Sequence, residues 1–508
     1  MTRPAADNQK HQTLKLRRLG IDTYTDPVIY MRSDCHVCRA EGFEARARVK
    51  VAAGGREIVA TLNVVSGGFL SLDEAGLSEA AWRNLGAVEG ATVRVSHPEP
   101  VESDSLLRAK AYGGRLDEAG MNAIIRDVAG GLYSDLQLAA FVTACAGDRL
   151  DEAETIALTR AMINVGERIR WDFPVVADKH CVGGLPGNRT TPLIVAMVAA
   201  CGVHIPKTSS RAITSPAGTA DTMEVLAPVD LDIAAMRKVV EGEGGCVVWG
   251  GAMRLSPADD MLIKVERPLD FDSEGQLVAS VLSKKAAAGS THVVIDMPVG
   301  ATAKVRSAVA ARTLADRLRA VGAALGLQMR IEHTDGSQPV GRGIGPALEA
   351  RDLLAVLGRQ AGAPQDLRAR AVHLAGMVLE LAGAAPAGQG AQAAAASLDD
   401  GRAVRKFEAI CKAQGGMREI PRSSATHVVE AVSSSIVRGF DNRRLSRLAK
   451  LAGAPRQKAA GLELHVRTGD AVVRGQPLFT VHAEAEGELD YALDYLARHS
   501  IVLLEPAR

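Results

Sequence analysis

A stretch near the middle of the chain combines a lysine, a histidine and a run of glycines. Residues 178–192 read Asp-Lys-His-Cys-Val-Gly-Gly-Leu-Pro-Gly-Asn-Arg-Thr-Thr-Pro. A strand is expected to end just before them and a helix to begin near Pro192, capped by Thr190 or Thr191. Glycines let backbone N–H groups approach an anion, and a helix N-terminus adds partial positive charge. With Lys179 alongside, the stretch predicts a phosphate cradle, although an ordinary strand-to-helix turn is the structural alternative.

A second stretch, residues 207–221, is rich in hydroxyl groups. Five Ser or Thr residues lie between Thr208 and Ser215, and Thr219 follows. Hydroxyl groups are neutral donors that can hold phosphate or sugar oxygens. Taken alone, a solvated loop that caps the next helix explains the pattern better.

The third stretch, residues 270–285, predicts the start of a helix. Ser273 and Gln276 fit a capping box, and Ser280 and Lys284 would then lie one turn apart on one face. Asp272 precedes the helix, where an acidic residue is often only a cap. Spacing alone therefore leaves its role open between capping and catalysis.

Two further loops follow in the same half of the chain. The apolar run 293–297 predicts a buried strand, and the loop after it ends at Lys304. Loops at the ends of parallel strands are where α/β sheets bind ligands. Residues 341–346, which contain three glycines, are interpreted as packing and turn geometry.

The surrounding pattern predicts an α/β multidomain protein with a mainly parallel sheet. Short alternating runs at 13–19, 57–65 and 91–96 predict a small β domain, and a helical period follows from 103 to 170. Strand-like and helical segments then alternate up to about 416, which is typical of parallel α/β sheets. The expected domains are a β-rich extension at 1–100, a helical domain at 101–172 that also receives part of about 205–240, an α/β phosphate-binding domain at 173–420, and a C-terminal α+β domain at 421–508. The expected helical core comprises Ile124, Ile125, Leu138, Phe141 and Val142.

Composition narrows the class of protein. The 508 residues include 60 Lys+Arg and 59 Asp+Glu, a net charge of +1, which argues against nucleic-acid binding. Only 8 Phe, 6 Tyr and 3 Trp are present, so base-stacking platforms are disfavoured. The start of the chain shows no secretion signal, and the apolar run 192–203 is shorter than the about 20 residues that span a bilayer. We expect a cytoplasmic enzyme in which 192–203 is a buried helix.

Seven cysteines form no disulfide framework. A single Cys-x-x-Cys, Cys35 and Cys38, is weak support for a metal site because structural zinc takes four ligands. A reduced structural pair is the preferred interpretation, and no metal or cofactor is expected.

Taken together, the three stretches resemble the thymidine phosphorylase family, in particular its longer branch, which includes AMP phosphorylases. The resemblance runs from about 103 to the end of the chain and rests on Lys-His-x-x-Gly-Gly, Ser-x-Arg…Gly-Thr and Ser-x-x-x-Lys-Lys. It implies a helical domain hinged to an α/β domain, reversible phosphorolysis with inorganic phosphate as co-substrate, and a homodimer or larger homo-oligomer. The partners implied are a small nucleoside or nucleotide and phosphate, without nucleic acid or membrane.

The resemblance also implies roles for individual residues. His180 would stand near base and sugar, and Asp272 matches the proposed proton donor of the AMP branch. Phosphate would be held by Lys179, Gly184, Thr191, Ser209 and Thr219. The nucleoside or nucleotide would contact Ser210, Arg211, Ala212, Ile213, Thr214, Ser215, Ser280, Lys284 and Lys304.

The substrate stays open between two interpretations. The first is thymidine, giving thymine and 2-deoxyribose 1-phosphate; the second is AMP or another nucleoside 5′-monophosphate, giving free base and ribose 1,5-bisphosphate. Two departures weaken the pyrimidine interpretation. Cys181 replaces the usual hydroxyl residue, and the arginine that contacts thymine falls near Val265, where Lys264 or Arg267 would have to substitute.

Two alternatives belong to other classes. A phosphoribosyltransferase-like enzyme would need an acidic magnesium pair, for which Asp259 and Asp260 are the nearby candidates. A carrier module is suggested by residues 461–475, which resemble a biotinyl/lipoyl-type fold but lack its lysine-bearing modification turn.

Overall fold

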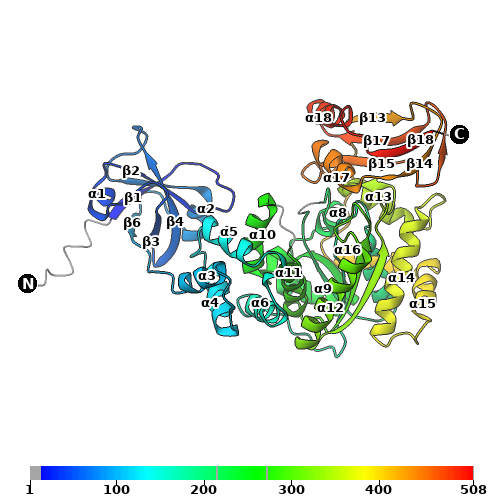
Figure 1. Cartoon of the computed structure of the whole chain (residues 1–508), viewed down its shortest axis with the longest axis horizontal. Helices are drawn as coiled ribbons and strands as arrows, with labels where there is room; N and C mark the ends of the chain where they lie inside the picture. The colour runs from blue at the N-terminus through cyan, green and yellow to red at the C-terminus, as the bar shows by residue number, and fades with distance from the viewer. Residues whose placement is uncertain (1–12, 213–214, 270–272, 507–508) are drawn as a thin grey trace, which may run out of the picture. The chain divides into compact units, whose positions relative to one another are not determined.

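The computed structural model describes residues 13–212, 215–269 and 273–506 (Figure 1). They form two compact units, each of which is described by itself. The smaller unit comprises Met1–Gly114 with Ala123–Thr143, and the larger comprises Arg115–Asn122 with Ala144–Arg508.

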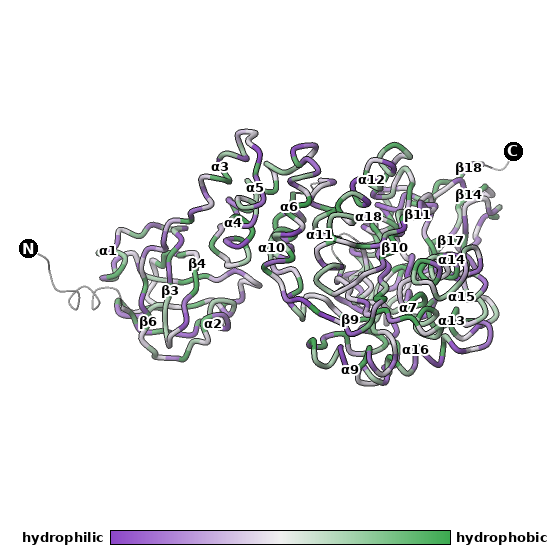
Figure 2. The backbone as a smooth tube through the Cα atoms, turned by 90° about the horizontal axis from the view of Figure 1, so that it is seen from below, coloured by the Kyte–Doolittle hydropathy of each residue, from purple (hydrophilic) through white to green (hydrophobic). Residues whose placement is uncertain are grey.

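A closed β-barrel forms most of the smaller unit, where the sequence predicted a small β domain. Its strands follow the order β1-β5-β2-β4-β3-β6. Along β6, Val93 and Val95 are buried whereas Thr92 and Arg94 are exposed, and Figure 2 shows the corresponding alternation of hydrophobic and hydrophilic residues along the barrel strands. This alternation gives the barrel its own apolar core. The elements are β1 (Thr13–Arg18), β2 (Val28–Arg32), α1 (His36–Glu41), β3 (Arg48–Ala53), β4 (Arg56–Val65), β5 (Glu74–Leu77), α2 (Glu79–Leu85) and β6 (Thr92–Ser96).

The helical period after residue 103 corresponds to α3 (Asp104–Ala111), α4 (Glu118–Ala129), α5 (Asp135–Ala144) and α6 (Glu152–Asn164). Asp151 and Glu154 complete a capping box at the start of α6. The expected core residues are all buried: Ile124, Ile125, Leu138, Phe141 and Val142. Cys35 and Cys38 are buried free thiols, and the Cys38 N–H donates to Cys35 Sγ at 3.3 Å.

Parallel strands form the centre of the larger unit, as predicted. β7 (Ala177–Cys181), β10 (His292–Val299) and β11 (Gln328–Asp335) pair in the order β11-β10-β7. β8 (Ile205–Ser209) and β9 (Gly245–Trp249) form a second parallel pair. A parallel bridge between Val176 and His204 links the two sets. The carboxyl ends of β7, β8 and β9 therefore open toward one side.

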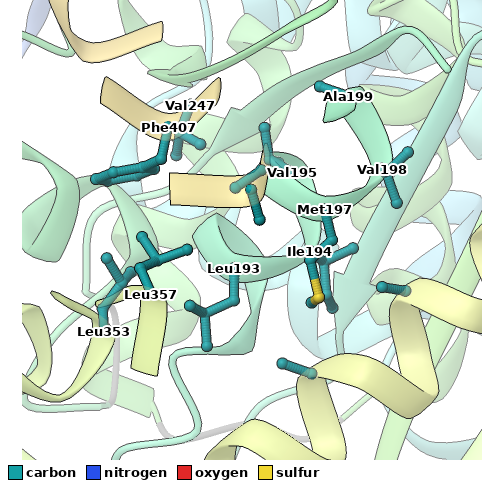
Figure 3. Close-up of a cluster of buried hydrophobic side chains, with 14 of the residues drawn as sticks. Leu193, Ile194, Val195, Met197, Val198, Ala199, Val247, Leu353, Leu357 and Phe407 are labelled. Carbon is teal, nitrogen blue, oxygen red and sulfur yellow. The ribbon is translucent and has the colours of Figure 1, made fainter. Parts of the chain in front are cut away.

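The apolar run near residue 192 forms the buried helix α7 (Thr190–Ala200), and every residue in it except Ala200 is buried. Its side chains pack in all directions: Figure 3 shows Leu193, Val195 and Met197 among Val247, Leu353, Leu357 and Phe407. The helix begins two residues before Pro192, and no side-chain cap bond is made by its N-cap, Arg189. Burial on all sides fixes where the first turn of α7 lies.

Helices cover the sheet and carry the third stretch. α11 (Glu274–Ala287) packs against α6 and α12 (Ala308–Ala324), and α10 (Pro257–Leu269) also contacts α6. Residues 205–240 form β8, α8 (Thr219–Leu226) and the start of α9 (Ile233–Glu243). α8 packs on α13 (Pro346–Leu357) and both α8 and α9 on β9. The predicted start of α11 is correct, but the capping box is not: Ser273 Oγ donates to the Cys145 carbonyl at 3.1 Å and makes no cap bond to the helix.

The remaining elements complete the larger unit. α14 (Gln365–Leu381), α15 (Gly390–Asp399) and α16 (Arg402–Ala413) pack around α7, and α15 contains the Ala-rich stretch near 390. The C-terminal part has its own apolar core and two antiparallel sheets, ordered β12-β15-β17-β13 and β16-β14-β18. Its elements are β12 (Gly343–Ile344), β13 (Ala425–Glu430), β14 (Ser435–Phe440), α17 (Asn442–Leu451), β15 (Gly461–Leu464), β16 (Ala471–Val472), β17 (Pro477–Ala483), α18 (Glu486–Leu496) and β18 (Val502–Pro506).

Candidate active site

A cavity of about 310 Å³ opens in the larger unit at the carboxyl ends of β7, β8 and β9. The first turns of α7 and α8 form one wall of it, and α10 with α11 forms another. Ligands of open α/β sheets bind at such strand ends. Among the described residues, the predicted site residues that line it are Lys179, His180, Gly184, Thr191, Ser209, Ser210, Arg211, Ser215, Thr219, Ser280, Lys284 and Lys304.

Lys179 lies on β7 with its side chain fully buried. Its Nζ is 3.2 Å from Asp296 Oδ2 on the neighbouring strand β10 and 2.9 Å from Thr190 Oγ1 in α7. Asp296 also accepts from Thr334 Oγ1 at 2.7 Å. Burial is the largest single effect on Asp296 and raises its pKa, but Lys179, Thr334 and Arg370 together outweigh it and hold the pKa below its usual range. The Asp296 carboxylate, which also accepts a hydrogen bond from Thr334, thus fixes Lys179 at the cavity wall.

The glycine loop after β7 comes very close to another backbone segment. Gly184 has φ of +80°, and a Cβ at this position would lie 2.4 Å from the backbone nitrogen of Lys304. Only glycine fits both the positive φ and this close approach. The loop therefore brings Lys304, which follows β10, to the same cavity as Lys179.

Ser209 and Thr219 approach the cavity from the two ends of the hydroxyl-rich loop. Ser209 ends β8, and its buried Oγ has no hydrogen-bond partner among the described residues. Thr219 is the first residue of α8, where free N–H groups give the helix a partial positive charge. Asp221 fixes the loop by accepting from the Ala212 N–H at 2.6 Å and the Gly218 N–H at 2.9 Å. A buried hydroxyl without a partner is costly, so a ligand oxygen would stabilise it.

Arg189 is a cavity residue that sequence reasoning did not single out. Its guanidinium donates to Glu349 Oε2 at 2.6 Å, to Thr219 Oγ1 at 2.8 Å and to the Ala217 carbonyl at 2.8 Å. Burial raises the pKa of Glu349, and Arg189 works against that rise. Nothing in the local sequence distinguishes Arg189 from a surface residue of a turn, because its partners lie 28, 30 and 160 residues away.

Arg211 lines the cavity but its charged end is already engaged. Its two terminal nitrogens lie 2.7 and 2.8 Å from the Glu224 carboxylate, and its guanidinium stacks 4.8 Å from the ring centre of Trp249. Glu224 holds the pKa of Arg211 above its usual range. The side chain therefore shapes the loop. Ala212 offers its N–H to Asp221, and the predicted contacts Ile213 and Thr214 lie outside the described residues.

A second buried charge cluster lies under the cavity. Asp178 Oδ1 is 3.1 Å from Lys207 Nζ, and its Oδ2 is 2.7 Å from Lys285 Nζ. Burial raises the pKa of Asp178, but the two lysines outweigh it and hold the pKa below its usual range. Burial lowers the pKa of Lys207 to about 7. Two lysines and one carboxylate leave excess positive charge beneath the cavity at pH below 7.

His180 follows Lys179 on β7 and lines the cavity. Burial and the neighbouring lysines hold its pKa well below the usual range of histidine, so the imidazole is neutral at pH 7. Burial raises the pKa of the Cys181 thiol to about 12, which leaves it a weak donor. A neutral imidazole can donate or accept a hydrogen bond but does not carry a spare proton.

The α10–α11 wall differs in its chemistry. Ser280 and Lys284 lie on α11 as predicted, and Lys284 Nζ is 2.5 Å from Asp259 Oδ2. Burial raises the pKa of Asp260 to about 6 and that of Glu266 to about 7.

For two residues that the sequence singles out, the structure describes no side chain. Asp272, the predicted proton donor, lies outside the described residues, as does the side chain of Arg267. Asp259 is paired with a lysine, which does not suit it as a magnesium ligand. Within the part of the chain that the structure describes, no group of three His, Cys, Asp or Glu side chains is placed to hold a metal ion.

Comparison with models of protein families matches three segments of the chain. The helical bundle domain of a glycosyl transferase family matches residues 104–166, and the α/β domain of that family matches 174–404. The C-terminal domain of pyrimidine nucleoside phosphorylase matches 436–502. That last match includes the whole of residues 461–475, the segment considered above as a carrier module.

Two proteins of similar sequence identify the family of the chain. The chain is 67% identical over 484 residues to a protein of Polaromonas sp. (strain JS666), which covers 95% of each chain. It is 65% identical to a protein of Acidovorax sp. (strain JS42), covering 95% of this chain and 94% of the relative. They are named "Putative thymidine phosphorylase" and "Putative thymidine phosphorylase 2". The chain thus belongs to the thymidine phosphorylase family of glycosyl transferases.

Solved structures share the fold. Anthranilate phosphoribosyltransferase from Thermus thermophilus superposes with a TM-score of 0.51 at 21% identity, covering 61% of this chain and 98% of that one. The enzyme from Saccharomyces cerevisiae gives a TM-score of 0.50 at 14% identity, with the same coverage. Across the described residues, no helix combines the length and apolar character needed to cross a membrane.

Proposed function

We propose that the protein catalyses reversible phosphorolysis of a nucleoside, transferring the pentose from a base to inorganic phosphate. The observation that carries this proposal is the buried Ser209 hydroxyl, which has no partner among the described residues and faces a cavity that Lys179 and the first turn of α8 also line. An ammonium, hydroxyl donors and helix N–H groups suit a phosphate dianion. The shared family and the match of 436–502 support the same reaction.

In the reaction, a phosphate oxygen forms a bond to C1′ of the sugar while the bond from C1′ to the base nitrogen breaks. The electron pair leaves with the base, which takes a proton. Lys179, Ser209 and Thr219 orient the attacking phosphate. His180, neutral at pH 7, hydrogen-bonds base or sugar, and Asp272 donates the proton to the base. No cofactor or metal takes part.

Thymidine is the first substrate proposed, since the relatives carry that name. AMP is the second candidate, and one feature favours it. The cavity lysines Lys179, Lys207, Lys284 and Lys285 each lie within 4 Å of a carboxylate. Lys304 is exposed and, among the described residues, forms no ion pair within 4 Å, although its charge lowers the pKa of Glu266. A 5′-phosphate on the substrate would supply its missing partner.

The test is a substrate panel. Purified protein is incubated with phosphate and with thymidine, uridine or AMP, and free base and sugar phosphate are measured. Release of base that depends on phosphate supports the proposal. Release without phosphate would indicate a hydrolase, and no release from any substrate would refute phosphorolysis.

Assembly and location belong to the same proposal. We expect a homodimer or larger homo-oligomer that works in the cytoplasm on small molecules. Light scattering of the purified protein measures the assembly, and a monomer at micromolar concentration would contradict it.

A further inference from the structure

The hydroxyl of Thr219 has a partner that decides where its proton points. A threonine hydroxyl has one proton to donate and two lone pairs to accept with. Arg189 donates to Thr219 Oγ1 at 2.8 Å, which occupies an acceptor position and leaves the proton unused. No acceptor for that proton is found among the described residues. Both side chains line the cavity.

Arg189 is itself held in place from two directions. Its Nε donates to Glu349 Oε2 at 2.6 Å and its other terminal nitrogen to the Ala217 carbonyl at 2.8 Å. Glu349 is almost completely buried, and it also accepts from Thr222 Oγ1 at 3.0 Å and from the Gly345 N–H at 3.2 Å. Thr222 lies one turn after Thr219 on α8. The same network therefore fixes the guanidinium and the helix that carries the hydroxyl.

Arginine suits this position better than lysine. The planar guanidinium donates in several fixed directions, here to a carboxylate, a hydroxyl and a carbonyl at once. A lysine ammonium is a single point that reaches one or two of these partners.

We propose that Arg189 is a positioning residue for phosphate: by donating to Thr219 Oγ1, it directs the Thr219 proton into the cavity, where a phosphate oxygen accepts it. Arg189 acts through Thr219 and does not contact phosphate itself. The inference rests on the proposed function only in taking phosphate as the anion of this cavity.

The decisive experiment is a double-mutant cycle on phosphate binding. Inorganic phosphate is titrated calorimetrically, without nucleoside, into wild type, R189M, T219V and R189M/T219V. We expect each single variant to weaken phosphate binding about tenfold, equivalent to about 1.4 kcal/mol. The double variant is expected to bind within about twofold of T219V, because the arginine has no effect once the hydroxyl is gone. A double variant that is about 100-fold weaker than wild type would overturn the proposal and give Arg189 an independent contact.

Further variants separate positioning from folding. R189M leaves the Glu349 carboxylate buried without its cation, which can destabilise the fold. R189M/E349Q removes both charges, and its phosphate affinity is measured with and without T219V. R189K is expected to recover only part of the affinity. Arg368, which pairs with Asp399 on the surface, gives the matched control R368M, expected to bind as wild type does. If loosening of the fold were the cause, R189M would weaken phosphate binding equally whether or not T219V is also present, and the proposal would fail.

The result of the double-mutant cycle can be distinguished from the result of the substrate panel. If phosphate binds with the expected coupling but no nucleoside is cleaved, the proposed function fails while the role of Arg189 stands. If nucleoside is cleaved and the KM for phosphate rises additively in the double variant, the function stands and the role of Arg189 is wrong.

Discussion

The two walls of the cavity are built in opposite ways. On the wall formed by β7, β8 and the first turns of α7 and α8, Lys179, Lys207 and Arg189 each have a carboxylate partner within 3.2 Å. On the side formed by α10 and α11, desolvation raises the pKa of two α10 carboxyl groups toward neutrality. Asp260 lines the cavity and keeps an exposed side chain, whereas Glu266 is not among the residues that line it. The first wall holds cations that are paired with carboxylates, and of these Lys207 has a pKa of about 7. The second side holds carboxyl groups of α10 that can gain or lose protons near pH 7.

This difference matches the two halves of the proposed reaction. Attack by phosphate needs an anion held in one orientation, and preorganised charges provide that with little reorganisation. Departure of the base needs proton transfer and recognition of base edges, for which carboxyl groups with pKa values near neutrality are suited. Changes to the first wall should therefore damage phosphate use and stability together. Changes to the second should act on turnover and on the choice of substrate.

The largest effect is expected from removing Lys179. K179M takes away the cation of the cavity wall and leaves Asp296 buried and unpaired. We expect kcat/KM for phosphate to fall about 10³-fold or more, and the free energy of unfolding to fall by about 3–5 kcal/mol.

Two controls accompany this measurement, made by steady-state kinetics and urea unfolding. K179M/D296N is expected to recover stability but no activity, because the charge imbalance is relieved and the anion ligand is still missing. K238M changes an exposed lysine of α9 and should match wild type. Full activity in K179M would show that Lys179 does not contribute to phosphate binding.

The next largest effect is expected at Asp272. D272N should lower kcat by about 10²-fold with a smaller change in the KM for nucleoside, as for loss of a general acid. D316N, at an exposed acid of α12, is the matched control. Equal turnover in D272N and wild type would return Asp272 to a capping role and make Asp260 the next acid to test.

Much of the fold followed from local patterns. The alternation in the barrel strands and the apolar run of α7 were readable because neighbours in sequence determine them. The capping box predicted at Ser273 was wrong, because the Cys145 carbonyl offers a hydroxyl partner that no local pattern reveals.

The candidate site was predictable where residues are adjacent and not where they meet through the fold. Lys179 on β7 and Gly184 in the loop that follows are close in sequence, and both line the cavity. Arg189, Glu349 and Asp296 come from segments far apart in sequence, and only strand pairing and helix packing bring them together. Arg211, predicted to contact the nucleoside, lines the cavity, and its charge is paired with Glu224, a partner that residue types alone do not reveal.

Removing the Lys304 ammonium is expected to have a smaller effect on kcat/KM, and that effect should depend on the substrate. Because its ammonium pairs with no described carboxylate, K304M should lower kcat/KM for AMP about tenfold and leave that for thymidine within about twofold. Parallel kinetics on both substrates measure the ratio, and K412M on the surface of α16 serves as control. Equal losses on both substrates would mean that Lys304 acts through its contact with the Gly184 loop and not on a 5′-phosphate.

The smallest effect expected is a pH dependence carried by Lys207. With a pKa of about 7, Lys207 is charged below that pH and adds to the positive charge that Lys285 and Asp178 leave under the cavity. Above pH 7 it loses this charge. K207M should therefore bind phosphate about fivefold more weakly than wild type at pH 6 and almost equally at pH 8.5.

Calorimetric titration at both pH values gives the ratio of the two dissociation constants. The second ionisation of phosphate falls in the same range, but it is common to both proteins and cancels in that ratio. A ratio that stays constant from pH 6 to 8.5 would show that Lys207 keeps its charge throughout. In that case Lys207 would act as a fixed charge like Lys179 and Arg189. Proton exchange near pH 7 would then involve only the carboxyl groups on α10.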